Sequence, residues 1–411
     1  MSVEQEVPAP GRWREAFNRV VSGGWAVSLG AIVLAVLGGS VMIAATDEAV
    51  GDAAGYFFSR PGDAFGAIGT AVGGAYAALF RGAVWDFRAD DLATAIRPLT
   101  NSLNQATPLI AAGLGVALAF RAGMFNIGGR GQMLAAAVGA GWVGFGLHLP
   151  APLHLIVAIL AGIAAGAVWG GIAGLLKAIT GAHEVIVTIM LNYVAFYLVE
   201  YLLATPGLLQ APGSANPKTP AMLPTAVMPR LLGERFNLTW AFVLALVAVA
   251  FTWWLLNRSR LGFEFRAVGE NPAAARVAGI DVPRITVYAM LVAGGLVGLA
   301  GVSQVLGASP AGFTSGIDAA IGFDAITVAL LGRSSPVGVL GAGILFGAFK
   351  AGGSTMQAAE GVPIEIVLVM QSLIVLFIAA PPLVRAMFRL PKPGAVRSAR
   401  PAKAEKAEVA A

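Results

Sequence analysis

The sequence has no cysteine and few charged residues. Only 12% of its 411 residues are Asp, Glu, Lys or Arg, whereas soluble domains carry about 25%. The lack of cysteine excludes disulfides and thiolate metal sites. A hydrophobic fraction of 57% and a mean hydropathy of +0.77 then indicate an integral membrane protein.

The chain also lacks the nucleotide-binding motif G-x4-G-K-[ST]. The stretch GAFKAGGST at 347–355 has similar letters in another order, so no P-loop is expected to hold ATP here. The three histidines stand at no spacing typical of metal ligands. We therefore expect no catalytic residue, no metal site and no cofactor in this chain.

Glycine, in contrast, is abundant, with 53 residues. Gly162, Gly166, Gly170 and Gly174 recur at every fourth position, which places them on one face of a helix. Helices in lipid pack closely through small residues. This face is therefore predicted to be a helix–helix contact.

Apolar runs of about 20 residues predict membrane-spanning helices. Ten are expected, at 25–45, 99–119, 131–147, 153–177, 185–204, 237–256, 284–306, 320–332, 336–356 and 363–388. The glycine-punctuated segment 65–84 is expected to lie on the membrane surface, with an eleventh span as the alternative. The predicted fold class is an all-α integral membrane bundle of about 10 transmembrane helices (8–11).

The distribution of basic residues predicts the orientation of these helices. Ten spans place both chain ends on one side, and assigning that side to the cytoplasm gathers 19 of the 27 Lys and Arg residues there. This bias indicates cytoplasmic N- and C-termini. The expected divisions are a basic lead-in 1–24, a transmembrane domain 25–388 with external loops 46–98 and 205–236 and a cytoplasmic loop 257–283, and a disordered cytoplasmic tail 389–411.

The cytoplasmic loop 257–283 contains the signals of a short helix. Asn271 is a suitable N-cap, and Pro272 suits the first helical position because its missing N–H costs nothing there. The residues 273–278 favour a helix, which Gly279 is expected to end. Membrane insertion does not require such a helix, so it suits a docking surface for a partner; a tight connector is the alternative.

The stretch FRAGMFNIGGRGQML at 120–134 interrupts two apolar runs. Gly128 and Gly129 permit the backbone to break, and Asn126 and Gln132 are placed to satisfy the polar groups that a break frees. Irregular backbone is tolerated at membrane depth where it is buried in protein or lines a cavity. We interpret the stretch as a hinge or gate at the inner mouth of a pathway; an ordinary loop is the alternative.

Four further polar residues lie within the apolar runs. They are Glu184, Asn192, Asp324 and Thr327. Ionisable or polar groups are costly in lipid and are therefore candidates for function. We expect them to line a translocation pathway, with hydrogen bonding between helices as the alternative for Asn192 and Asp324.

Four blocks of the sequence together resemble a known family. They are FRAGMFNIGGRGQ, EVIVTIMLNYVAFYLVEYLL, GENPAAARVAGIDVPRITVYAMLVAGGLVGLAG and GFDAITVALLGRSSPVGVLGAGILFGAFKAGG. The chain resembles permease subunits of bacterial ABC importers of the branched-chain amino acid/ribose type, and within them the nucleoside and simple-sugar permeases. The likeness extends over about residues 95–385.

The resemblance implies roles for two of these blocks. AAARVAG at 273–279 is similar to the EAA-x3-G pattern, with Ala273 in place of Glu and with Ala274 and Ala275 retained, so the short helix would be a coupling helix that docks on an ATPase. Related permeases read F-N-I-G-A-E-G-Q where this chain has Arg130. That reversal of charge predicts that the Arg130 side chain faces water or lipid headgroups.

The resemblance also implies partners and a location. A separate ATPase chain would bind ATP and Mg, a second permease subunit would complete a homo- or heterodimer, and an extracytoplasmic lipoprotein would deliver nucleosides or simple sugars. The location would be the bacterial plasma membrane, in contact with membrane lipid and without nucleic acid. The alternatives are an ion-coupled secondary transporter that works alone and an ABC permease for branched-chain amino acids.

Overall fold

The computed structural model describes residues 24–388. The expected basic lead-in and cytoplasmic tail therefore lie outside the described residues, apart from Gly24. The described residues form helices joined by turns and loops, with a single isolated β-bridge between Arg230 and Thr239. The chain divides into two compact units, 43–367 and the paired segments 1–42 and 368–411.

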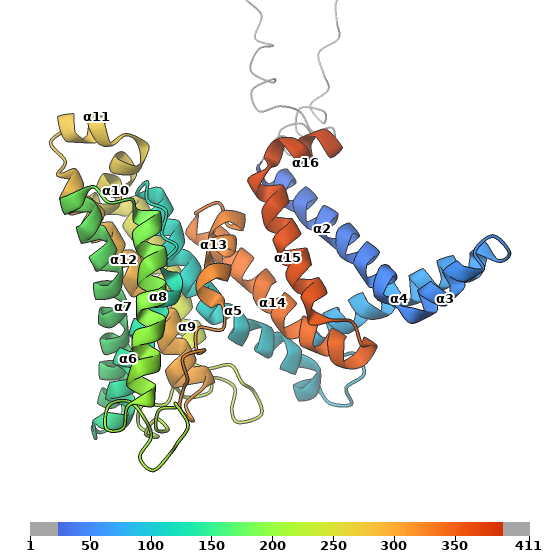
Figure 1. Cartoon of the computed structure of the whole chain (residues 1–411), viewed down its shortest axis with the longest axis horizontal. Coiled ribbons are helices and arrows are strands. Elements are labelled where there is room, and N and C mark those ends of the chain that lie inside the picture. Colours follow the sequence, from blue (N-terminus) through green and yellow to red (C-terminus); the bar gives the residue numbers. More distant parts are fainter. Residues whose placement is uncertain (1–23, 389–411) are drawn as a thin grey trace, which may run out of the picture. The chain divides into compact units, whose positions relative to one another are not determined.

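Helices occupy all ten stretches for which they were expected. In chain order the structure contains α2 (Gly24–Thr46), α3 (Glu48–Gly55), α4 (Pro61–Ala83), α5 (Leu92–Arg121), α6 (Gly129–Gly146), α7 (Leu153–Thr180), α8 (Glu184–Ala204), α9 (Ala241–Arg258), α10 (Arg260–Glu270), α11 (Pro272–Val277), α12 (Val282–Ser303), η1 (Gln304–Ala308), α13 (Ile321–Leu331), α14 (Pro336–Glu360), α15 (Ile364–Ala379) and α16 (Pro381–Met387) (Figure 1). The five residues of η1 continue α12 as a π-helical end.

Among the described residues, eight helices are long and apolar enough to cross a membrane, or nine if α15 and α16 make one span. The eight are α2, α4, α5, α7, α8, α9, α14 and α12 with its continuation η1. Two expected spans, α6 and α13, are helical but fall short of this test, because α6 begins with polar residues and α13 has only 11 residues. The surface-lying segment 65–84 is part of α4, whose length and composition make it a candidate span.

The centre of the larger unit is built from α5 and α12. Residues 106–119 of α5 are continuously buried, and so are residues 293–303 of α12. A helix that is apolar on all sides is stable only where neighbours surround it. The more peripheral α7 and α8 bury a much smaller share of their residues.

The predicted glycine face of α7 packs against α12. A Cβ atom on Gly166 would lie 2.7 Å from both the carbonyl oxygen of Gly294 and the Cα atom of Gly298. A Cβ on Gly170 would lie 2.7 Å from the carbonyl oxygen of Met290. Because these neighbours are backbone atoms, only glycine allows the two helices to approach this closely. We call this contact the glycine seam.

The smaller unit contains most of α2, most of α15, and α16. A Cβ on Gly38 of α2 would lie 2.7 Å from the Leu373 side chain, so the two helices pack closely. The helix expected at 363–388 is not continuous, because the chain bends by 94° between α15 and α16. Pro381 begins α16, and proline cannot continue a preceding helix.

The two expected external loops differ from each other. Much of 46–98 is helical, in α3, α4 and the start of α5. The segment 205–236 has no helix, yet it packs onto the unit: the amide of Met222 donates to the carbonyl of Pro310, and that of Met228 donates to the carbonyl of Leu306. Met222, Ala226 and Met228 are buried. The segment 205–236 therefore packs over the end of the larger unit at which η1 lies.

Candidate functional site

The loop 257–283 forms a helical hairpin at one end of the larger unit (Figure 1). The sequence predicted α11 but missed α10, an 11-residue helix that precedes it. The side chain of Ser259 caps α10 by accepting from the amide of Gly262 at 2.9 Å. The backbone of Gly269 in α10 lies against that of Arg121 and Gly123 at the end of α5. We call this the α11 end of the unit.

The predicted capping of α11 is confirmed. The Asn271 side-chain oxygen accepts from the amides of Ala273 at 3.0 Å and Ala274 at 3.1 Å. Pro272 occupies the first turn, and Gly279 follows the helix with φ +82°. Ala275 is buried, whereas Val277 is 91% exposed. The hairpin thus holds α11 with an apolar side chain facing outward.

The break expected at 120–134 lies between α5 and α6 and is closed by hydrogen bonds. The Asn126 side chain exchanges two bonds with that of Gln132, at 3.2 and 3.0 Å, and its oxygen also accepts from the amide of Gly128 at 2.9 Å. The Asn192 amide group of α8 accepts from the amide of Gly131 at 2.8 Å and donates to the carbonyl of Ile127 at 2.9 Å. These polar groups therefore replace the hydrogen bonds that a continuous helix would supply.

The side chains that make this network are buried. Asn126 is 0%, Gln132 1% and Asn192 4% exposed. Their hydrogen bonds connect α6 and α8 to the break. This favours a role in holding the fold together for these three side chains. Substrate contact by any of them stays a prediction. The indole nitrogen of Trp169, close to Gly131, is buried with no hydrogen-bond partner among the described residues.

Glu184 ties three segments together at the first turn of α8. Its carboxylate lies 2.8 Å from the ammonium group of Lys177 near the end of α7. It also accepts from the amide of Phe125 at 3.4 Å. The Glu184 side chain is 13% exposed, so within this chain it braces the break.

The starts of α6 and α13 meet at backbone contact. A Cβ on Gly129 would lie 2.7 Å from the carbonyl oxygen of Gly322, and one on Gly322 would clash with the backbone of Arg130. The start of α13 therefore leaves no room for a methyl group at Gly129. We call this contact the α6–α13 junction.

Arg130, expected to face water or headgroups, is partly exposed and also forms an ion pair within the chain. Its Nε donates to Oδ1 of Asp318 at 3.3 Å, and its guanidinium carbon lies 4.5 Å from the centroid of the Phe196 ring. The Arg130 side chain is 28% and that of Asp318 is 5% exposed. A buried carboxylate needs a partner, so Arg130 is held inward at the junction. The sequence offered no signal for this pair, because its members are 188 positions apart.

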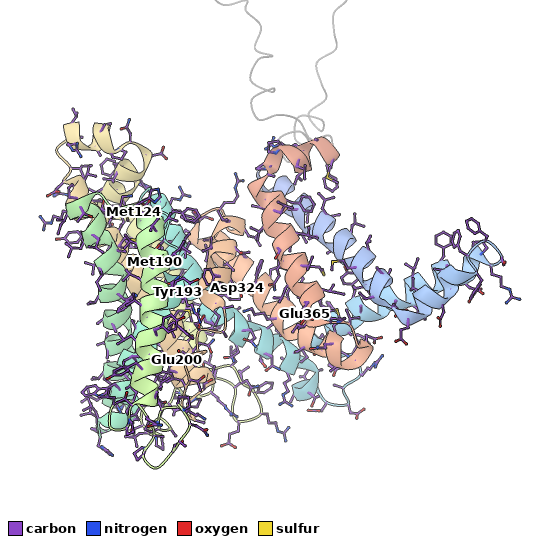
Figure 2. All side chains as sticks on the ribbon, in the orientation of Figure 1. Met124, Met190, Tyr193, Glu200, Asp324 and Glu365 are labelled. Carbon is purple, nitrogen blue, oxygen red and sulfur yellow. The ribbon has the colours of Figure 1, made fainter. Side chains whose placement is uncertain are left out.

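A second ion pair joins α13 to α14. Asp324 is labelled in Figure 2, and its carboxylate lies 2.7 Å from the ammonium group of Lys350 in α14, with side chains 24% and 22% exposed. Thr327, one turn further along α13, is partly buried. The two ion pairs hold α13 and the segment before it between α6 and α14.

Both ends of α13 have strained backbone. Ala319 and Ala320 precede it with φ of +43° and +60°, and Arg333 and Ser334 follow it with +54° and +50°. Side chains disfavour this left-handed region, and such residues cluster at functional sites. The short helix therefore has a bend at each end that the surrounding contacts must hold.

A polar cavity of about 490 Å³ lies at the end of α5 far from α11. Its polar lining consists of Arg81, Asp86, Thr94, Arg97, Asn101, Asn104, Gln105, Asn237, Ser354 and Thr355. Pro98 and Pro108 stand inside α5, and a proline supplies no N–H to the carbonyl four residues earlier. The carbonyls of Thr94 and Asn104, two lining residues, thus lack their usual helical donors. Hydrogen bonds from the side chain and the amide of Thr94 lower the pKa of the neighbouring Asp91.

The cavity has the size of a small-molecule site, and its lining is polar. Side-chain amides and hydroxyls outnumber charged groups in its lining. Asn237, from the segment before α9, donates to the side chain of Asn101 at 3.2 Å. The sequence carries no local signal for this cavity, because its residues come from four separated segments. Within residues 24–388, no three His, Asp or Glu side chains gather to hold a metal ion.

These features define a polytopic helical membrane protein in which a hydrogen-bonded break separates α5 from α6. The family described as the permease component of branched-chain amino acid transport systems matches residues 99–379. The chain belongs to this family and is the membrane-spanning permease of an ABC importer. The alternative of a secondary transporter working alone is therefore wrong.

Curated relatives agree with this assignment. The chain is 39% identical to the guanosine ABC transporter permease protein NupP of Bacillus subtilis, over 72% of this chain and 84% of that protein. It is 38% identical to the glucose ABC transporter permease protein TsgB13 of Haloferax volcanii, over 68% and 75%. It is 34% identical to the nucleoside ABC transporter permease protein NupB of Lactococcus lactis, over 75% and 85%. No solved structure matches the chain.

Proposed function

We propose that this permease moves nucleosides or simple sugars into the cell across the plasma membrane. The observation that carries this substrate class is the similarity to permeases whose names specify guanosine, glucose and nucleosides. Such solutes are uncharged and rich in hydroxyl groups, so they need hydrogen-bonding side chains and aromatic surfaces along their route. A permease for branched-chain amino acids is the alternative.

The polar cavity supports this substrate class. Its amides and hydroxyls offer both donors and acceptors, which hydroxyl groups of a sugar ring require in pairs. If the α11 end faces the cytoplasm, the cavity lies on the outer side. We infer that it receives the solute from an extracytoplasmic substrate-binding lipoprotein.

The exposed face of helix α8 carries a row of aromatic side chains. Tyr193, Tyr197 and Tyr201 recur at every fourth position and are 55%, 62% and 63% exposed. Figure 2 shows Tyr193 on this helix together with Met190 and Glu200. A phenol has an apolar ring and a polar tip that prefers a partner, so a row of them suits a path for solutes better than contact with lipid tails.

The α10–α11 hairpin is the proposed docking point for a separate ATPase chain that binds ATP and Mg. Asn271, Pro272, Ala273, Ala274, Ala275 and Gly279 set its geometry, and Val277 offers the exposed apolar contact. A second permease subunit, either identical or different, would complete the membrane-spanning part of the transporter. The α11 end would then face the cytoplasm together with both chain ends.

Docking can be tested with Val277→Asp, because this side chain is exposed and its replacement leaves the fold of the hairpin intact. We expect the variant to reach the membrane in folded form, to lose at least about tenfold in affinity for the ATPase, and to lose uptake. Leu232→Asp, at an exposed position in the segment 205–236, is the matched control. Normal uptake by Val277→Asp would exclude the hairpin as the docking point.

The substrate class can be tested by competition. Uptake of a labelled nucleoside is measured with the assembled transporter against unlabelled nucleosides, ribose, glucose and branched-chain amino acids. Failure of nucleosides and sugars to compete would refute the substrate class and leave the permease assignment standing. For the cavity, Asn104→Leu should raise the KM of uptake by about 2–10-fold through lost hydrogen bonds; an unchanged KM would remove the cavity from the route.

A further inference from the structure

A second, smaller polar cavity lies at the α11 end of the larger unit. It has a volume of about 280 Å³ and is formed where α5 and α9 end, α14 begins and α10 passes. Its lining residues are Arg121, Trp253, Leu256, Asn257, Arg266, Ser334, Ser335, Pro336 and Val337. This lining contains two arginines and no carboxylate.

Each arginine is anchored to backbone at one nitrogen. The Nε of Arg121 donates to the carbonyl of Ser334 at 3.0 Å, and an Nη of Arg266 donates to the carbonyl of Leu256. Among residues 24–388, neither guanidinium forms an ion pair with a carboxylate. A guanidinium carries five N–H donors in a fork that matches phosphate oxygens. Two positive charges with spare donors therefore face one small cavity.

The beginning of α14 adds to this preference for an anion. Ser335 caps the helix through the amide of Gly338 at 3.2 Å. Pro336 has no N–H, while the amide of Val337 belongs to the first turn and lacks an intrahelical acceptor. The positive end of the helix dipole points toward the cavity. The two arginines, the amide of the first turn and the helix dipole thus all favour a negatively charged ligand in this cavity.

The surroundings place the cavity at the level of lipid headgroups. Trp253 and Trp254, near the end of α9, are 46% and 51% exposed, and Val337 is 66% exposed. Exposed tryptophans at the end of a spanning helix mark the membrane–water interface. Arg258 and Arg260 follow immediately and are exposed. The cavity therefore opens beside an aromatic belt.

We propose that this cavity binds the phosphate of an anionic phospholipid, with Arg121 and Arg266 as its ligands. The volume admits a headgroup phosphate and excludes the acyl chains, which would lie along the exposed apolar surface of α9. Basic pockets between membrane helices recognise anionic headgroups by this combination of charge and interface. The bound lipid would add a further link among α5, α9, α10 and α14 where they converge at the α11 end.

The test uses the purified full-length permease in detergent with added lipids. Cardiolipin or phosphatidylglycerol should raise its thermal unfolding midpoint in a saturable manner, whereas phosphatidylcholine should not. The double variant Arg121→Gln/Arg266→Gln should weaken anionic lipid binding by at least about tenfold, measured by native mass spectrometry. The matched control Arg258→Gln/Arg260→Gln removes the same charge outside the cavity and should change binding by less than about threefold.

Two further arms keep the proposal falsifiable. Val337→Asp places a negative charge at the exposed mouth, leaves both arginines in place, and should weaken lipid binding even if the double variant fails to fold. Inorganic phosphate at about 10 mM, alone, should not reproduce the stabilisation, because the headgroup also gains from the membrane surface. Equal loss in the cavity and control variants, or full stabilisation by free phosphate, would overturn the assignment to a lipid.

Discussion

The glycine seam and the α6–α13 junction are two places where helix backbones approach closely, and they achieve it by opposite means. At the seam, two continuous helices meet through the absence of side chains on Gly166, Gly294 and Gly298. At the junction, two helix starts meet, and buried amides and ion pairs satisfy the irregular backbone around them. The seam has one favourable arrangement, whereas hydrogen bonds and ion pairs at the junction can exchange partners. The comparison indicates a rigid frame beside a part that is able to rearrange.

The largest effect is expected from Asn192→Leu. The change leaves the amide of Gly131 and the carbonyl of Ile127 buried without partners, at about 1–3 kcal/mol for each group. The free energy of unfolding in detergent should fall by the sum of the two. The control is Asn216→Leu, at an exposed position in the segment 205–236. Equal stability of the two variants would mean that the break does not depend on Asn192.

Gly166→Ala should have the next largest effect. The added methyl group would meet backbone atoms of α12 at 2.7 Å, and neither helix can move without disturbing the whole seam. Overpacking of this kind costs about 1–3 kcal/mol. Gly341→Ala in α14 is the control, because nothing lies within 4 Å of its Cβ position. The thermal unfolding midpoint of the two variants decides whether the seam is as tight as described.

The ion pair at the junction can be measured by a double-mutant cycle. With Arg130→Met and Asp318→Asn, we expect a coupling free energy of about 1–2 kcal/mol, because the Asp318 carboxylate is nearly buried and screened little by solvent. A coupling near zero would show that the two charges are solvated independently. In that case the junction would be held by the amide network alone.

The smallest effect is expected for Lys177 and Glu184. Their side chains are 31% and 13% exposed, so solvent screens the pair more than the one at the junction. The cycle with Lys177→Gln and Glu184→Gln should give less than about 1 kcal/mol. The value should fall further in about 1 M salt, where the Debye length is about 3 Å. A coupling larger than that of Arg130 and Asp318 would reverse the ranking of the two sites.

The sequence predicted the elements better than their contacts. Hydrophobic runs located helices in all ten expected stretches, and cap chemistry located α11, since both depend on residues close together in the chain. α10 was missed because its polar residues resemble a loop, and the bend at Pro381 was missed because apolar composition continues across it. The break at Asn126 was recognised from its glycines. The partners of Arg130, Asp324 and Asn192 lie 26 to 188 positions away, beyond any local pattern.

The distance between α7 and α12 in the chain has a consequence for synthesis. Thr180 ends α7 and Ser303 ends α12, 123 positions later. At about 5–20 residues per second, the ribosome finishes α12 roughly 6 to 25 seconds after α7. During that interval the part of the glycine face of α7 that packs on α12 lacks this neighbour, and lipid fills it poorly. The newly made chain therefore passes through a stage in which α7 is open to capture by other small-residue helices, and cells that express it in excess would meet that hazard first.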